Sequence, residues 1–292
     1  MRQAEIGIIG GSGLYEMEGL SDVRSVRVET PFGDPSDEVI LGALGGRRLA
    51  FLPRHGKGHR LLPSEINFRA NIFALKKLGV ERILSVSAVG SMKEEIAPGH
   101  IVIPDQFVDL TKRRVSTFFG SGVVGHAALG DPVCAETAGI LSESGRAVGA
   151  TVHPKGTYVC IEGPQFSTRA ESNIYRGWGV DVIGMTNVTE AKLAREAEIC
   201  YATIALATDY DCWHEEHDDV TVEAVLKIMK QNVETARRIL AKAVSSLPAA
   251  RGCSCGAALQ NAVMTAPDLI PAQARRDLDP LIGKYLSAPS RV

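Results

Sequence analysis

The sequence lacks a long hydrophobic run, since no apolar stretch in its 292 residues reaches the roughly 18 residues that a membrane-spanning helix needs. Residues 1–13 also lack a charged segment followed by a long apolar one, so we expect no secretory signal peptide. The formal net charge is only −2, which gives no electrostatic reason to expect binding to nucleic acid or to a membrane surface. We therefore expect a cytoplasmic protein that acts on a small molecule.

Cysteine is sparse, with six residues in the chain. Four stand singly inside apolar or motif-like segments, namely Cys134, Cys160, Cys200 and Cys212. This distribution is typical of reduced core thiols and argues against a secreted disulfide scaffold. The pair Cys253 and Cys255 fits a strained disulfide, half of a metal site or two exposed thiols. Of these, metal is the least favoured, because no nearby histidine completes a zinc site.

Short apolar runs alternate with helical patterns along a chain that is 45% apolar and long enough for one large α/β domain or two smaller ones. We predict strands at 5–9, 38–44, 48–52, 83–86, 101–104, 157–161, 180–183 and 199–207. Helices are predicted at 64–78, with Ser64 as its cap, and at 131–147, 168–176, 189–197 and 221–247. The pattern fails after Pro248, so we place a main domain at 1–250 and a C-terminal extension at 251–292 with weak helix at most.

Two carboxylates, Asp209 and Asp211, directly follow the apolar run 199–207. Open α/β sheets usually bind ligands at the carboxyl ends of their strands, and alternate residues of an extended segment point the same way. Both acids are therefore placed to face one pocket. For an isolated Asp-x-Asp, a solvated turn is the favoured explanation, because aspartate is a common turn residue.

A glycine loop, Gly10 to Gly13, follows the first predicted strand. The dinucleotide fingerprint fails because Glu16 stands where its third glycine belongs, and no Gly-Lys-Ser/Thr completes a phosphate loop. Backbone N–H groups and the Ser12 hydroxyl still suit an anion. A plain turn explains the glycines about as well.

The segment Arg54 to Arg60 holds five basic or imidazole side chains among glycines, which suits an oxyanion or, alternatively, a solvated basic loop. The small residues Ser87 to Ser91 form a second predicted loop, where a ligand can approach the backbone closely. Gly163-Pro164 marks a turn that projects Phe166, and a projected aromatic ring can stack on a flat base.

Taken together, five motifs resemble the S-methyl-5′-thioadenosine phosphorylases of the trimeric purine nucleoside phosphorylase group. They are Gly10-Gly11-Ser12-Gly13, Thr30-Pro31-Phe32-Gly33, Arg54-His55-Gly56, EGPQFSTRAES at 162–172 and ATDYDCW at 207–213. The similarity covers about residues 5–247 in the family's order. The resemblance implies a single α/β domain with a central mixed, partly barrel-like sheet flanked by helices, and a homotrimer with active sites at subunit interfaces.

The implied reaction is attack of phosphate on C1′ of methylthioadenosine, which yields adenine and methylthioribose 1-phosphate for purine and methionine salvage, without metal or organic cofactor. By resemblance, phosphate is bound by Ser12, Arg54, His55, Ser87, Ala88 and Thr186. The nucleoside is bound by Phe166, Met185, Val222, Val225 and Leu226, with His126 and Pro63 from a neighbouring subunit.

The same resemblance implies that a protonated Asp209 donates its proton to N7 of the leaving purine and that Asp211 has a supporting role. Relatives that act on oxopurines tend to carry Asn at the first position, so Asp209 favours a 6-aminopurine. Gln165 departs from the family, where Arg is frequent.

Three other functions stay open at this stage. They are a purine nucleoside or methylthioinosine phosphorylase of broader specificity, a nucleosidase that uses water, and a nucleotide-binding or sensor domain that is not an enzyme.

Overall fold

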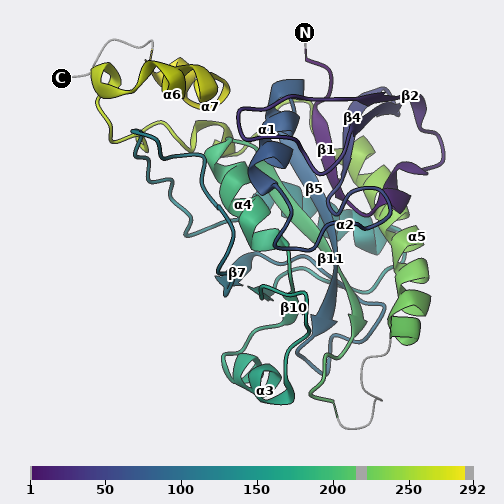
Figure 1. Ribbon diagram of the computed structural model, residues 1–292. Coiled ribbons are helices and arrows are strands. Elements are labelled where there is room, and N and C mark those ends of the chain that lie inside the picture. The colour runs from purple at the N-terminus through teal and green to yellow at the C-terminus, as the bar shows by residue number, and fades with distance from the viewer. Residues whose placement is uncertain (1, 215–221, 287–292) are drawn as a thin grey trace.

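The computed structural model describes residues 2–214 and 222–286, which are built around a mixed β-sheet of eleven strands (Figure 1). The strands are β1 (Ile6–Gly10), β2 (Ser21–Val26), β3 (Val39–Leu44), β4 (Arg47–Pro53), β5 (Arg82–Ser91), β6 (Ile101–Val102), β7 (Gln106–Asp109), β8 (Val152–His153), β9 (Thr157–Cys160), β10 (Val182–Gly184) and β11 (Cys200–Asp209). The main path runs β2-β3-β4-β1-β5-β10-β9-β7, and β11 joins it at β5 and leads to β6 and β8. The predicted α/β fold with a central mixed sheet is confirmed.

Helices lie on both faces of this sheet (Figure 1). They are α1 (Phe68–Leu78), α2 (Ala135–Ala147), α3 (Arg169–Gly177), α4 (Asn187–Glu196), α5 (Val222–Ser246), α6 (Ala272–Asp277) and α7 (Asp279–Leu286), with short 3₁₀ turns η1 (Ser12–Tyr15), η2 (Ser254–Ala257) and η3 (Pro267–Leu269). Helix α2 packs against α5, and α1 packs against α4. The chain therefore folds as a sheet between two helical layers.

The strands show why both faces must be covered. Consecutive residues of β11 alternate between the two main cores, since Tyr201 packs in the α1–α4 core while Ala202 and Ile204 pack in the α2–α5 core. Strand β1 behaves likewise, with Ile8 and Ile9 in opposite cores. Side chains of a strand alternate in direction, so a near-continuous apolar run is the sequence of a strand that is buried on both faces.

Strands β5 and β11 form the centre of the sheet and run parallel, with Ser87 opposite Ala205 and Gly90 opposite Asp209. The register shifts between Ala207 and Asp209. Both strands consequently end at the same edge of the sheet, and the residues that follow them share that edge.

Several predictions of element bounds are wrong, including the helix predicted at 131–147, which begins at Ala135. The helix predicted at 64–78 begins at Phe68, because Asn67 rather than Ser64 caps it: its side-chain oxygen accepts from the backbone N–H of Ala70 at 3.1 Å. The segment predicted as a small-residue loop at 87–91 continues β5 instead, because β10 and β11 both pair with it and satisfy its backbone groups.

Residues 251–286 are more ordered than their composition indicates. Leu259, Ile270, Leu278 and Ile282 are buried in the same core as Ile72 of α1. The segment therefore packs on the main body of the chain, although its Gly, Ala and Pro content hides that packing from periodicity analysis.

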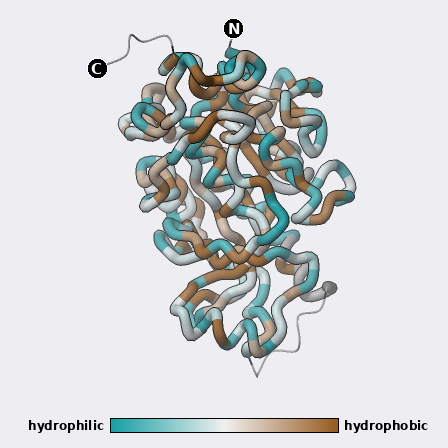
Figure 2. Tube along the Cα trace, turned by 60° about the vertical axis from the view of Figure 1, so that its left-hand side comes forward, coloured by the Kyte–Doolittle hydropathy of each residue, from teal (hydrophilic) through white to brown (hydrophobic). Residues whose placement is uncertain are grey.

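Hydrophobic residues, drawn in brown, lie mainly in the interior of the molecule, and the turns at its surface are more hydrophilic (Figure 2). Within residues 2–214 and 222–286, none of the helices combines the length and the apolar character needed to cross a membrane.

Candidate active site

A cavity of about 450 Å³ opens at the carboxyl ends of β5 and β11. The predicted site residues on its wall are Arg54, His55, Pro63, Ser87, Ala88, Phe166, Met185, Thr186, Asp209 and Asp211. Its volume lies within the range of pockets that enclose a small organic ligand. The cavity therefore gathers segments that are far apart in the sequence but meet at one edge of the sheet.

Asp209 is the last residue of β11, and its carboxyl group is mostly shielded from water. One carboxyl oxygen accepts from the backbone N–H of Asp211 at 2.8 Å, and the other lies 2.6 Å from the Thr208 hydroxyl. Burial raises the pKa of Asp209, and it also raises the pKa of Asp211, where the nearby Asp209 charge acts in the same direction. The pair is thus biased toward holding a proton rather than full negative charge.

The backbone of β5 approaches this pair closely at Gly90. A β-carbon placed on Gly90 would lie 3.0 Å from Oδ1 of Asp209 and 3.0 Å from Cγ2 of Ile183. Any larger residue at position 90 would crowd the Asp209 carboxyl group, so glycine allows that group to occupy its observed position.

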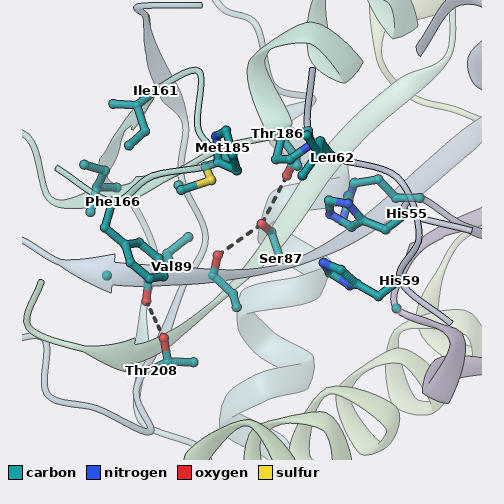
Figure 3. Close-up of a pocket in the computed structure, with 18 of the residues that line it drawn as sticks. His55, His59, Leu62, Ser87, Val89, Ile161, Phe166, Met185, Thr186 and Thr208 are labelled. Atoms are coloured by element: carbon teal, nitrogen blue, oxygen red, sulfur yellow. Dashed lines mark hydrogen bonds between the residues drawn. The ribbon is translucent and has the colours of Figure 1, made fainter. Parts of the chain in front are cut away.

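Two hydroxyl groups meet in the middle of the cavity, where Oγ of Ser87 lies 3.3 Å from Oγ1 of Thr186 (Figure 3). Ser87 comes from β5, and Thr186 precedes α4. The Ser87 hydroxyl also lies 3.3 Å from the carbonyl oxygen of Ala88, which lines the cavity as well. Hydroxyl and backbone N–H groups of this kind suit the oxygens of an anion.

Arg54 lies at the floor of the cavity and is only 3% exposed. Its guanidinium group forms an ion pair with Glu190 of α4 and donates to the Val86 carbonyl at 2.9 Å and the Ser85 hydroxyl at 2.6 Å. Burial alone would lower the pKa of Arg54, but the Glu190 carboxylate outweighs it, so the pKa is raised. Glu190 thus fixes the cation in place and also neutralises much of its charge.

His55 is neutral in this environment, because burial and the Arg54 charge lower its pKa to about 4. Its Nδ1 lies 2.8 Å from the carbonyl oxygen of Leu61. A carbonyl can only accept, so Nδ1 carries the ring proton and Nε2 is left as an acceptor. The ring of His59 stacks on it at 4.2 Å.

The opposite side of the cavity is apolar. Phe166, Ile161 and Met185 lie across from His55 and His59 (Figure 3). Phe166 is 66% exposed, as expected for a ring projected from a turn. A β-carbon on Gly163, whose φ is +69°, would lie 2.5 Å from the sulfur of Met185, so glycine lets the turn approach that side chain.

Some predicted residues lie elsewhere. Pro63 was expected to reach the site from a neighbouring subunit, but it lines the cavity of its own chain. His126 is exposed, pairs its backbone N–H with the Ala262 carbonyl at 2.8 Å, and does not line the cavity of its own chain. The side chains of Ser12, Val222, Val225 and Leu226 lie outside what the structure describes.

Sequence analysis missed residues that matter to the geometry. Glu190, Gly90 and Thr208 each contact a predicted site residue, and His59 shares the wall with His55. One available signal was the position of Glu190, four residues after Thr186 and inside the first turn of α4. The contact between Gly90 and Asp209 depends on pairing of distant segments, whereas Thr208 adjoins Asp209 and His59 belongs to the basic segment 54–60.

The chain matches the model of the phosphorylase superfamily over residues 5–245. It is 64% identical to an S-methyl-5′-thioadenosine phosphorylase of Geobacter sulfurreducens, over 96% of this chain and 99% of the relative. A solved methylthioadenosine phosphorylase from an Antarctic soil metagenomic library is 50% identical, with a TM-score of 0.93 over 96% of this chain and 99% of that one. The methylthioadenosine phosphorylase of Schistosoma mansoni in complex with adenine is 40% identical, with a TM-score of 0.80 over 88% and 96%.

Proposed function

Since the chain belongs to the phosphorylase superfamily, among the S-methyl-5′-thioadenosine phosphorylases, we propose that its cavity binds methylthioadenosine and phosphate together. Phosphate attacks C1′, adenine leaves, and methylthioribose 1-phosphate forms. The observation that carries this proposal is a single cavity with hydroxyl, arginine and imidazole groups in one part and proton-holding carboxyl groups in another.

Phosphate binds between Arg54, His55, Ala88 and the two hydroxyls of Ser87 and Thr186. Monohydrogen phosphate has one O–H group, which donates a hydrogen bond to the unprotonated Nε2 of His55. Arg54 supplies positive charge, and its pairing with Glu190 keeps the guanidinium oriented. The dianion is thereby held with its remaining oxygens free to attack the sugar.

The purine binds at the Asp209 end. Bond cleavage at C1′ leaves negative charge on the base, so a protonated Asp209 stabilises the departing adenine by donating to N7. The raised pKa of Asp209 supports this role. The Thr208 hydroxyl adds support, because it has one proton and lies 3.2 Å from the Val89 carbonyl as well as 2.6 Å from Asp209 (Figure 3). Because the hydroxyl proton can go to Val89, the contact with Thr208 does not require an ionised Asp209, and the proton of Asp209 stays available for N7 as the base departs.

Asp211 supports the base from beside Asp209, and Phe166 and Met185 cover the base and the ribose. The apolar side chains of Val222, Val225 and Leu226 surround the methylthio group, with His126 contributed by a neighbouring subunit. Because apolar pockets discriminate by only about 1–3 kcal/mol per methyl-sized group, some cleavage of adenosine accompanies the main reaction.

A homotrimer is part of the proposal. It is supported by the exposure of Phe166 at the mouth of the cavity and by His126, which the cavity of its own chain does not reach. Light scattering coupled to size-exclusion chromatography tests it, with a mass near three times 31.2 kDa expected. A monomeric mass with full activity contradicts it.

The test of function is the release of adenine from methylthioadenosine with and without phosphate, beside methylthioinosine and inosine. We expect phosphate-dependent release and a clear preference for the aminopurine. Full-rate release in phosphate-free buffer would establish a nucleosidase, and preference for the oxopurines would establish a phosphorylase of broader or different specificity. Binding without turnover would establish a sensor domain.

A further inference from the structure

Four cysteines that are distant in sequence meet at the amino end of β11. The sulfur atoms of Cys134, Cys200, Cys253 and Cys255 all lie within 4.8 Å of one another. Three of these cysteines are buried, and Cys253 is half-buried. The remaining two cysteines of the chain, Cys160 and Cys212, are not part of this cluster.

Secondary structure holds each of the four in place. Cys134 caps α2, and its backbone N–H donates to the Tyr201 carbonyl at 2.9 Å. Cys200 begins β11, and its backbone N–H donates to the Glu81 carbonyl at 3.0 Å. The Cys253-Ser254-Cys255 segment begins the η2 turn, so two ligands come from one tight turn and two from the body of the fold.

We propose that these four cysteines form a tetrathiolate site for Zn²⁺. A structural zinc site of this kind has four sulfur ligands with Zn–S bonds of about 2.3 Å, which places the sulfurs about 3.8 Å apart at the corners of a tetrahedron. In the cluster the sulfurs of Cys200 and Cys253 are 3.3 Å apart, and all six separations are below 4.8 Å. Four mutually close sulfurs are what a tetrahedral ion requires, whereas disulfides require only two separate pairs.

The surroundings suit bound thiolates. The Thr137 hydroxyl donates to the sulfur of Cys134 at 3.4 Å. Arg82 is opposite Cys200 in the β5–β11 register, is only 1% exposed, and donates to the carbonyl oxygen of Ala250 at 3.0 Å. A zinc ion with four thiolates carries a net charge of −2, and the Thr137 hydroxyl stabilises it directly. The Arg82 charge contributes less, because Arg82 also pairs with Glu136 at 3.4 Å. Each thiol that binds releases its proton to water, and no oxidant takes part.

The sequence-based expectation put metal last because it looked for a histidine close to Cys253 and Cys255. The structure supplies the missing ligands from Cys134 and Cys200 instead. The cluster lies about 30 Å from Asp209, which is nine residues further along the extended strand β11. The ion therefore ties residues 251–286 to the centre of the sheet and takes no part in chemistry at the cavity.

The experiment loads the full-length chain, purified with a phosphine reductant, with Zn²⁺ or with Co²⁺ and removes unbound ion by gel filtration. We expect one zinc per chain by elemental mass spectrometry, and for Co²⁺ the strong near-ultraviolet charge-transfer bands of thiolate ligation. Removal of the ion by a chelator should lower Tm by at least about 5 °C. A reduced chain that takes up neither ion, or cysteines isolated from cells as two disulfides, overturns the proposal.

Variants separate this site from adventitious binding. Cys253→Ser removes the least buried ligand, and we expect affinity for Zn²⁺ to fall roughly 100-fold or more, since loss of outer groups alone costs 10–100-fold. Cys212→Ser is the matched control outside the cluster, and its zinc content should be unchanged. Equal zinc loss in both variants, or in neither, contradicts the assignment. If Cys253→Ser does not fold, the Co²⁺ spectrum of the unmodified chain still decides, and the methylthioadenosine assay tests the proposed function separately.

Discussion

The two ends of strand β11 differ in almost every physical respect. At its amino end, Cys200 is fully buried and packs against the other three thiols of the cluster. At its carboxyl end, Asp209 borders an open cavity beside a shift in register. The same apolar run thus anchors a packed, closed cluster at one end and presents carboxyl groups to a ligand at the other. The difference shows that one buried strand can position two kinds of polar or reactive group, one at each end, while its interior remains mainly apolar.

Replacing Asp209 tests the reactive end and carries the largest expected effect. Asp209→Asn keeps the shape of the side chain but removes the proton donor, so we expect kcat for methylthioadenosine to fall by about 10²- to 10⁴-fold. Asp211→Asn is the matched control and should lose less, because Asp211 has the supporting role. If Asp209→Asn turned over methylthioadenosine at the wild-type rate, Asp209 would not be the proton donor.

Replacing Glu190 tests the polar network that lies between the two ends. Glu190→Gln leaves the Arg54 guanidinium buried without its counter-ion, so we expect the free energy of unfolding to fall by about 3–5 kcal/mol. Denaturant titration measures the change, and phosphate KM should rise as Arg54 loses its orientation.

The control for Glu190 lies on the same helix. Glu196 is a buried acid whose pKa is raised by burial, and it accepts from the Phe118 N–H at 2.7 Å and the Thr117 hydroxyl at 2.8 Å. Among residues 2–214 and 222–286, it forms no ion pair. Glu196→Gln should therefore cost less than about 1 kcal/mol. Equal losses for both variants would show that burial, rather than the Arg54 pair, sets the cost.

Replacing Gly90 tests whether the reaction depends on the exact position of the Asp209 carboxyl group. The added β-carbon of Gly90→Ala would lie 3.0 Å from Asp209 and 3.0 Å from Ile183, so both side chains must move by a few tenths of an ångström. We expect kcat to fall roughly 10-fold, because small displacements of catalytic groups are costly. Gly139→Ala in α2, with open space around it, is the control and should leave kcat unchanged. A wild-type kcat for Gly90→Ala would show that a small displacement of the Asp209 carboxyl group does not affect the reaction.

The sequence predicts the parts of the molecule that are periodic and local. The buried strand 199–207 and the helices at 168–176 and 221–247 all follow from patterns within one segment. The position of Asp209 and Asp211 at a strand end follows from the same strand. These features need no knowledge of what packs against them.

The remaining features depend on pairing between distant segments. Ser87 to Ser91 resemble a loop until β10 and β11 pair with them. Glu190 becomes the partner of Arg54, and Cys134 becomes a neighbour of Cys255, only when separate elements fold together. Spacing along one chain segment contains no signal for such contacts, so the cysteine cluster could not be predicted.

The smallest expected effect is the contribution of Asp209 to the pH dependence of stability. Burial raises the folded-state pKa of Asp209 above the ordinary 3.8, so the native state binds the proton more tightly than the unfolded state does. Stability from this group is present below pH 3.8 and is lost as pH rises through the higher folded-state pKa. At pH 7, Asp209→Asn should be more stable than the wild type although it is far less active, and the gain should vanish as pH falls toward 3.8. Paired denaturant titrations from acid to neutral pH measure the difference, and a variant that is less stable at pH 7 would mean that hydrogen bonds from Thr208 and Asp211, rather than burial, dominate at Asp209.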